Sequence, residues 1–172
     1  MQYSSADASR KWFVLVAVGL SMFVTAMHEN LVSIAIPELV NAFDSDFNTM
    51  QWLSVGYFLS LAVTLVSMGR LGDMIGKKKV FVAGFGVLAL GVFLLGLAPN
   101  AALANASRPV VGVGAALALS VGIGILTEDF PPRQRGLAIG LIGLFISAGV
   151  VLGPLVGGLL LRLGSWRWLF LT

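Results

Sequence analysis

Two long apolar stretches of this chain are joined by the sequence Gly69-Arg-Leu-Gly-Asp-Met-Ile-Gly-Lys-Lys-Lys79. It contains the glycines Gly69, Gly72 and Gly76. Glycines permit a tight turn and let the flanking helices approach each other closely. Asp73 lies near a run of lysines that includes Lys77 and Lys78, where its carboxylate can form an ion pair or face a helix N-terminus. A basic loop beside a membrane explains the lysines, but it does not explain the spacing G-x-x-x-D-x-x-G-K-K.

The composition excludes an ordinary soluble domain. Of the 172 residues, 58% are hydrophobic and only 11% are charged, whereas a soluble domain usually carries about 25% charged residues. Charge-free runs cover residues 12–27, 51–69, 80–107, 109–127 and 136–161. A helix needs about 20 mostly apolar residues to cross a bilayer, and these runs lack the alternation of membrane β-strands.

The sequence therefore predicts an all-α integral membrane protein that contacts the lipid bilayer directly. We expect five complete transmembrane helices and the start of a sixth at residue 166. The complete helices are expected at about 12–39, 51–71, 80–98, 101–126 and 137–161. The turn signal Pro99-Asn100 separates the third helix from the fourth.

The distribution of Lys and Arg predicts the orientation. If five helices alternate in direction, eight basic residues lie on one side: Arg10, Lys11, Arg70, Lys77, Lys78, Lys79, Arg133 and Arg135. The other side has Arg162 and Arg167. This asymmetry predicts a multi-pass protein of the cell inner (plasma) membrane with a cytoplasmic N-terminus. A cleaved signal peptide is the alternative for the N-terminus, but apolar sequence resumes at Leu31 and favours a retained helix.

Several function classes are disfavoured by what the sequence lacks. It has no cysteine and one histidine, so it offers no disulfide framework, no thiolate site and no multi-histidine metal site. No phosphate-binding G-x-x-x-x-G-K-[ST] loop and no Ser/His/Asp set is present. We therefore expect no catalytic residue, metal or cofactor, and no enzyme activity. The net charge of +3 comes from basic residues that flank apolar runs, so we expect no nucleic acid partner.

Three motifs resemble those of the major facilitator superfamily. The spacing after Gly69 resembles motif A, and Arg108-Pro-Val-Val-Gly-Val-Gly-Ala-Ala116 resembles motif B. Gly149-Val-Val-Leu-Gly-Pro-Leu-Val-Gly-Gly158 matches motif C, which marks antiporters in that superfamily. The chain is most similar to the N-terminal part of the drug:proton antiporter branch with fourteen spans. In that branch helix one usually reads L-D-x-T-x-V-N-V-A-L-P, and here His28 and Ser33 replace the aspartate and the asparagine.

The resemblance implies the fold and the activity. The fold is the N-terminal helix bundle of the major facilitator fold, and the activity is proton-coupled efflux of small amphipathic or cationic organic compounds. Motif A implies a role in conformational change for Gly69, Asp73, Gly76, Lys77 and Lys78. Motif C implies a helix bend that packs the two halves together, formed by Gly149, Gly153, Pro154, Gly157 and Gly158.

Three ionisable residues are expected within the membrane. Arg108 lies about 11 Å into its helix, where a charge is costly unless it faces protein or water, although it could also extend to the outer interface. His28 and Glu29 interrupt the first apolar stretch, and Glu29 could accept protons or pair with Arg108. The alternative is that the helix leaves the membrane early and both residues meet water. We predict that Arg108, Glu29 and His28 line the cavity and carry proton coupling.

Two functions remain open at this point. The first is a transporter whose cavity is completed by a C-terminal half that this chain lacks. The second is a truncated relative that does not transport and serves as an accessory subunit among other membrane subunits. Five helices and a partial sixth cannot by themselves form the two bundles that alternating access requires.

Overall fold

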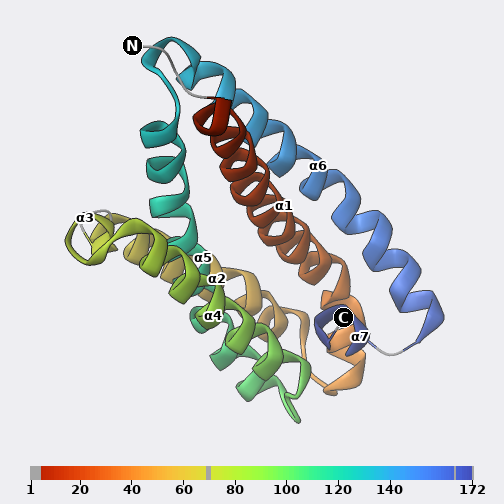
Figure 1. The fold of residues 1–172 in the computed structure, drawn as a ribbon. Coiled ribbons are helices and arrows are strands. Elements are labelled where there is room, and N and C mark those ends of the chain that lie inside the picture. Colours follow the sequence, from red (N-terminus) through yellow and green to blue (C-terminus); the bar gives the residue numbers. More distant parts are fainter. Residues whose placement is uncertain (1–4, 69–70, 165, 172) are drawn as a thin grey trace.

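The computed structural model describes residues 5–68, 71–164 and 166–171, and it is helical with no strand in these ranges (Figure 1). The elements are α1 (Ser5–Ala42), α2 (Phe47–Met68), α3 (Leu71–Ile75), α4 (Lys77–Gly96), α5 (Ala101–Asp129), the 3-10 turn η1 (Pro132–Gln134), α6 (Arg135–Leu163) and α7 (Trp168–Leu171). The long helices α1, α2, α4, α5 and α6 are apolar enough to cross a membrane. This confirms the predicted class: five spanning helices, followed by the short α7 where a sixth was expected to start.

The hairpin between α2 and α4 differs in detail from the prediction. It contains the separate five-residue helix α3, and α4 begins at Lys77 rather than at residue 80. Gly76 joins these two helices with φ 101°, a left-handed conformation that favours glycine. Gly69 was expected to help form this turn, but it lies outside the described residues.

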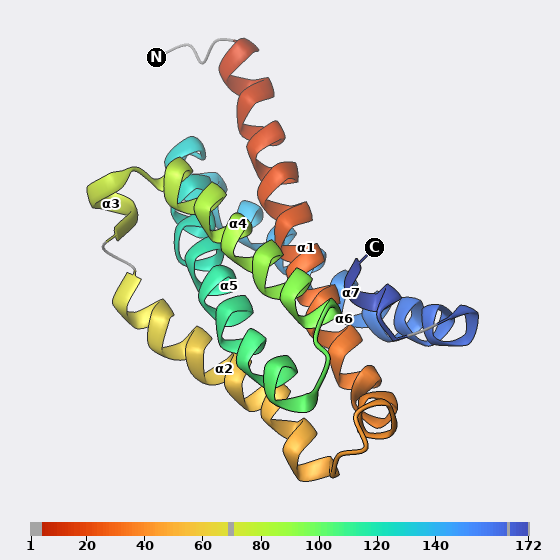
Figure 2. The same ribbon diagram turned by 90° about the horizontal axis from the view of Figure 1, so that it is seen from below.

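The long helices form two groups, which Figures 1 and 2 show from two directions. In the first group, α5 packs extensively against both α4 and α2, and in the second α1 packs along α6. We call these the α2–α4–α5 group and the α1–α6 pair. Packing between the two is much less extensive. The N-terminal bundle is therefore two closely packed units joined along a seam.

Glycines explain the close packing within the first group. A Cβ atom on Gly84 of α4 would lie 2.9 Å from the backbone nitrogen of Ala118 on α5. A Cβ atom on Gly112 of α5 would overlap the hydroxyl of Ser60 on α2. Because only glycine leaves room for such contacts, the sequence of α5 sets how near it comes to its neighbours.

Motif C has the same role in the second group. Its glycines at every fourth position, Gly149, Gly153 and Gly157, all face α1. At Gly153, a Cβ atom would lie 2.8 Å from the Met27 carbonyl oxygen and 2.9 Å from Asn30 Cβ. Gly158 has no atom within 4 Å of its Cβ position, and α6 continues through Pro154 as one helix. The glycine row of motif C thus packs within the bundle, and its contact with another half stays a prediction.

Two apolar clusters close the seam between the groups. One contains Val18 and Met22 of α1 with Leu126 at the end of α5. The other contains Val32 of α1 and Leu53 of α2, together with Trp166, Leu169 and Phe170 near α7. Along α1, residues 23–30 lie between the two clusters, and this stretch carries the polar residues predicted for the site.

Gly153→Ala should destabilise the protein, because the added methyl group would meet the α1 backbone at Met27. Overpacking of this kind typically costs about 1–3 kcal/mol. The matched control is Gly158→Ala, whose methyl group would meet nothing. Thermal unfolding of the complete protein in detergent measures both. Equal melting temperatures for the two variants would contradict the assigned α1–α6 interface.

Candidate functional site

Arg108 is the centre of the buried polar site. Its side chain is fully buried, so it does not extend to the outer interface. The Nε atom donates a hydrogen bond to the carbonyl oxygen of Leu53 on α2, at 2.8 Å. The guanidinium carbon lies 4.7 Å from the ring centre of Tyr57, also on α2, a distance typical of cation–π contact. Two contacts with α2 thus fix the direction in which the guanidinium points.

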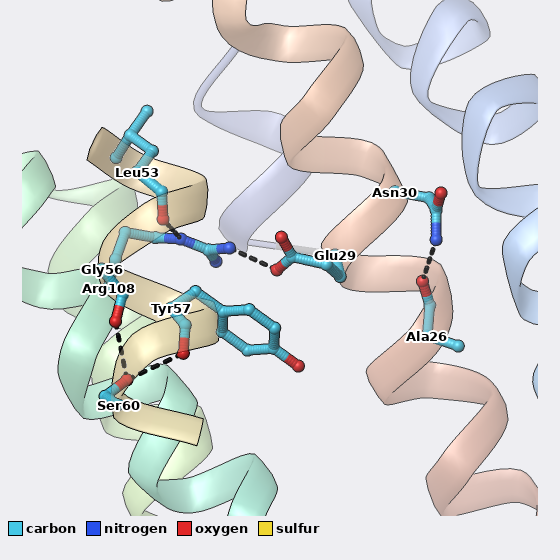
Figure 3. Close-up of polar contacts among 8 residues, drawn as sticks. All are labelled: Ala26, Glu29, Asn30, Leu53, Gly56, Tyr57, Ser60 and Arg108. Carbon is cyan, nitrogen blue, oxygen red and sulfur yellow. Dashed lines mark hydrogen bonds and ion pairs between the residues drawn. The ribbon is translucent and has the colours of Figure 1, made fainter. Parts of the chain in front are cut away.

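The end of the Arg108 guanidinium that is not bonded to α2 contacts Glu29 of α1 (Figure 3). The Arg108 Nη2 atom donates a hydrogen bond to Glu29 Oε2 and forms an ion pair with this carboxylate. The Glu29 side chain is 12% exposed, so α1 does not leave the protein interior at this point. The contact runs from α5 to α1, and it therefore crosses the seam between the two helix groups.

Each partner of the ion pair keeps an unused polar atom. Arg108 Nη1 and Glu29 Oε1 are both buried and have no hydrogen-bond partner among the described residues. A buried donor or acceptor without a partner costs about 1–3 kcal/mol, so each of these two atoms favours a further hydrogen bond. Arg108 Nη1 and Glu29 Oε1 are therefore the atoms through which the ion pair can bind a further polar group.

A cavity of about 290 Å³ lies directly beside Glu29. Its walls come from both helix groups: Met22, Thr25, Ala26, Glu29 and Asn30 of α1, Tyr57 and Phe58 of α2, Leu119 of α5, and Ile146 and Val150 of α6. Most of these side chains are apolar, and Glu29 contributes the ionisable carboxylate. Such a cavity, apolar with a few polar groups, is the usual form of a site for a small organic molecule.

Of the three predicted intramembrane residues, the structure joins two. Arg108 and Glu29 form the ion pair, whereas His28 points elsewhere, with its ring 5.8 Å from that of Phe170 in an edge-to-face arrangement. Neighbouring residues on a helix point about 100° apart, which explains this separation. His28 Nε2 is buried without a partner in the described part of the chain.

Two contributors to the site carried no signal in the sequence. Tyr57 is one of two tyrosines in the chain, and nothing about its spacing indicates that its ring lies against Arg108. The carbonyl of Leu53 is a backbone group, so residue identity gives no information about it. The neighbouring Asn30 does not join the ion pair, because its amide donates to the Ala26 carbonyl of the same helix, at 2.8 Å.

The motif A residues lie at the other end of the seam. Lys77 Nζ is 2.7 Å from Glu128 of α5 and 3.6 Å from Asp73, while Lys78 is exposed. Arg10 of α1 pairs with Asp129 of α5, at 2.7 Å. These residues line a second cavity of about 1080 Å³ between α1 and the ends of α3, α4 and α5. The basic end of the molecule is therefore cross-linked by exposed ion pairs, which are individually weak.

On the opposite face, the connection between α1 and α2 is capped by Asp46. Its carboxylate accepts hydrogen bonds from the backbone nitrogen and the hydroxyl of Thr49 in the first turn of α2. These bonds stabilise the ionised form and hold the pKa of Asp46 below its usual value. Within the described residues, no group of three or more His, Cys, Asp or Glu side chains could hold a metal ion.

Comparison with known proteins agrees with this architecture. The sequence model of the Major Facilitator Superfamily matches residues 18–172. A riboflavin transporter of Clostridioides difficile is 30% identical over 162 residues, which are 94% of this chain and 36% of that protein. A tetracenomycin C resistance and export protein of Streptomyces glaucescens is 32% identical over 167 residues, 97% of this chain and 31% of that protein.

A further relative is a multidrug resistance protein of Mycobacterium tuberculosis, 31% identical over 157 residues. The alignment covers 91% of this chain and 29% of that protein. The chain thus spans about a third of the length of the curated relatives that it matches.

Removing one charge of the ion pair should reduce the stability of the protein more than removing both charges. Arg108→Gln or Glu29→Gln leaves one buried charge without its partner, a change that typically costs about 3–5 kcal/mol. In the double variant no charge remains, so its loss of stability should be smaller than the sum of the two single losses.

Thermal unfolding of the complete protein in detergent measures this cycle. Arg162→Gln, at an exposed position in the last turn of α6, is the control and should change little. Additive losses would show that the two side chains are not coupled.

Proposed function

The chain belongs to the Major Facilitator Superfamily, and we propose that it forms part of the N-terminal bundle of a proton-coupled exporter of amphipathic organic compounds. The observation that carries this proposal is the buried ion pair between Arg108 and Glu29 beside an apolar cavity. An intramembrane carboxylate with one strong partner, the Arg108 guanidinium, is suited to hold and release a proton.

The chemistry of the proposal centres on Glu29. When ionised, Glu29 is held by Arg108; when protonated, it loses most of this attraction, and α1 is less firmly tied to α5. Each element packed around it contributes few competing groups: Arg108 from α5, Tyr57 from α2, and His28 from α1 itself, while the cavity wall from α6 is apolar. Protonation of Glu29 is therefore the main change in charge available to this site.

The position of the ion pair on the seam suggests how protonation of Glu29 is coupled to movement of the two helix groups. Glycine contacts hold each helix group together, but a polar contact crosses between the groups near the cavity. A proton on Glu29 would loosen this contact and change the shape of the cavity wall. Members of this superfamily move two helix bundles around a central site. We propose that a C-terminal half supplies the second bundle as the partner of this one.

The relatives support export as the direction of transport. One is named for tetracenomycin C resistance and export and another for multidrug resistance. The riboflavin transporter shows that a vitamin is also handled by a protein of this kind. We extend these activities to the present chain as a proposal, because it spans about a third of their length.

We also propose that the basic end of the molecule faces the cytoplasm and that the protein lies in the plasma (inner) membrane. Arg10, Lys77, Lys78 and Lys79 line the same cavity, so the first described turns of α1 and the α3–α4 hairpin lie at one end. Basic residues are enriched in cytoplasmic connections of membrane proteins, which supports this orientation.

Glu29→Gln should abolish transport driven by a pH gradient while leaving downhill exchange of substrate in place. Glutamine keeps the shape of the side chain but cannot carry the proton. The measurement uses the complete protein in proteoliposomes, with riboflavin and tetracenomycin C as probes and an internal pH indicator. Glu38→Gln is the matched control, because Glu38 is exposed near the far end of the same helix. Gradient-driven accumulation by Glu29→Gln would refute the role of Glu29.

A further inference from the structure

The charge balance inside the membrane is unusual for a site expected to accept cations. Between their charged ends, the spanning helices contain the ionisable residues His28, Glu29 and Arg108. With Glu29 ionised, its charge is cancelled by Arg108. With Glu29 protonated, the arginine charge remains, and a histidine can only add positive charge. The intramembrane part of this chain is therefore neutral or positive in every protonation state of Glu29.

The geometry makes this cancellation effective at the cavity. Glu29 forms part of the cavity wall, and the guanidinium that neutralises it is bonded to the same carboxylate. An organic cation in the cavity would leave water without gaining an uncompensated negative charge. An uncharged compound loses little by the same transfer, and the apolar side chains around it favour its burial.

The size and lining of the cavity further restrict the class of ligand that it can bind. The cavity volume of about 290 Å³ lies just below the usual range for ligand sites, about 300–1,000 Å³, and favours a small ligand. Two aromatic residues, Tyr57 and Phe58, form part of one wall. Rings of this kind favour flat aromatic ligands, because the two can stack.

We infer that the cavity beside Glu29 selects uncharged aromatic compounds over permanent organic cations, and that Arg108 sets this preference by neutralising Glu29. The inference rests on the proposed function, because it concerns the same cavity. It departs from the expectation, drawn from the resemblance to drug:proton antiporters, that cationic compounds are among the substrates.

Two probes with one ring system test the inference. 10-Methylacridone is uncharged and 10-methylacridinium is a permanent cation, and both are fluorescent tricyclic compounds of similar size. Binding is measured on the complete protein in lipid nanodiscs, with binding to empty nanodiscs subtracted. The uncharged probe should bind at least about tenfold more tightly, which corresponds to about 1.4 kcal/mol. Equal or tighter binding of the cation would overturn the inference.

Variants of Arg108 then show whether the charge of its side chain or its shape sets the preference between the two probes. Arg108→Gln leaves the carboxylate of Glu29 uncompensated, so at mildly alkaline pH, where the acridinium ring has not yet added hydroxide, the preference should shift at least about tenfold toward the cation. Arg108→Lys keeps the positive charge and should keep the preference for the uncharged probe. An unchanged ratio of the two affinities in Arg108→Gln at this mildly alkaline pH would overturn the role of Arg108.

The double variant Glu29→Gln/Arg108→Gln covers the case in which Arg108→Gln fails to fold. It has no charge at this pair, so it should prefer the uncharged probe as the native protein does. A preference for the cation in the double variant would show that charge cancellation is not the cause. Failure of the proposed function is distinct: the native protein would then transport neither riboflavin nor tetracenomycin C, whatever the ratio of the two probes.

Discussion

A guanidinium group buried between membrane helices must be given partners, and this requirement organises the centre of the molecule. Arg108 obtains them from two other helices: the Leu53 carbonyl and the Tyr57 ring from α2, and the Glu29 carboxylate from α1. The arginine can reach α2 because Gly112, one turn further along α5, lets the two helices approach closely. The pairing of the Arg108 charge therefore depends on the close approach of α5 to α2, since a wider spacing of these helices would leave the charge without its partners.

Different contacts hold the bundle together within and between its two helix groups. Rows of glycines hold α1 against α6 and α5 against α4 and α2, so each group behaves as a packed unit. Across the seam, apolar clusters lie toward both ends, and the ion pair and the 290 Å³ cavity lie between them. The polar contact that we propose to respond to a proton thus lies where the two units meet, beside the cavity. Exposed ion pairs such as Arg10–Asp129 join the units again at the basic end.

The sequence predicted the spanning helices well, because bilayer thickness imposes a length and composition that can be counted. It offered an ion pair with Arg108 as one of two roles for Glu29, because isolated charges in apolar helices require partners, and the structure shows this pair. It could not separate His28 from Glu29, since which of two adjacent residues faces a neighbour depends on how the helix is rotated in the bundle. The short helix α3, the role of the Leu53 carbonyl and the position of Tyr57 depend on tertiary packing, and no local pattern encodes them. For motif C the resemblance implied a bend that packs the two halves together, whereas the structure shows its glycine row packed against α1 of the same bundle.

The contact between Arg108 and Glu29 can be measured directly by solid-state NMR on the complete protein in lipid. Labelling the carboxyl carbon of glutamate with ¹³C and the guanidinium nitrogens of arginine with ¹⁵N allows their dipolar coupling to be recorded. Glu29→Gln and Arg108→Gln samples identify the signals from this pair. We expect a strong dipolar coupling at neutral pH that is lost when the sample is acidified enough to protonate Glu29. The absence of any coupling between the two groups at neutral pH would contradict it.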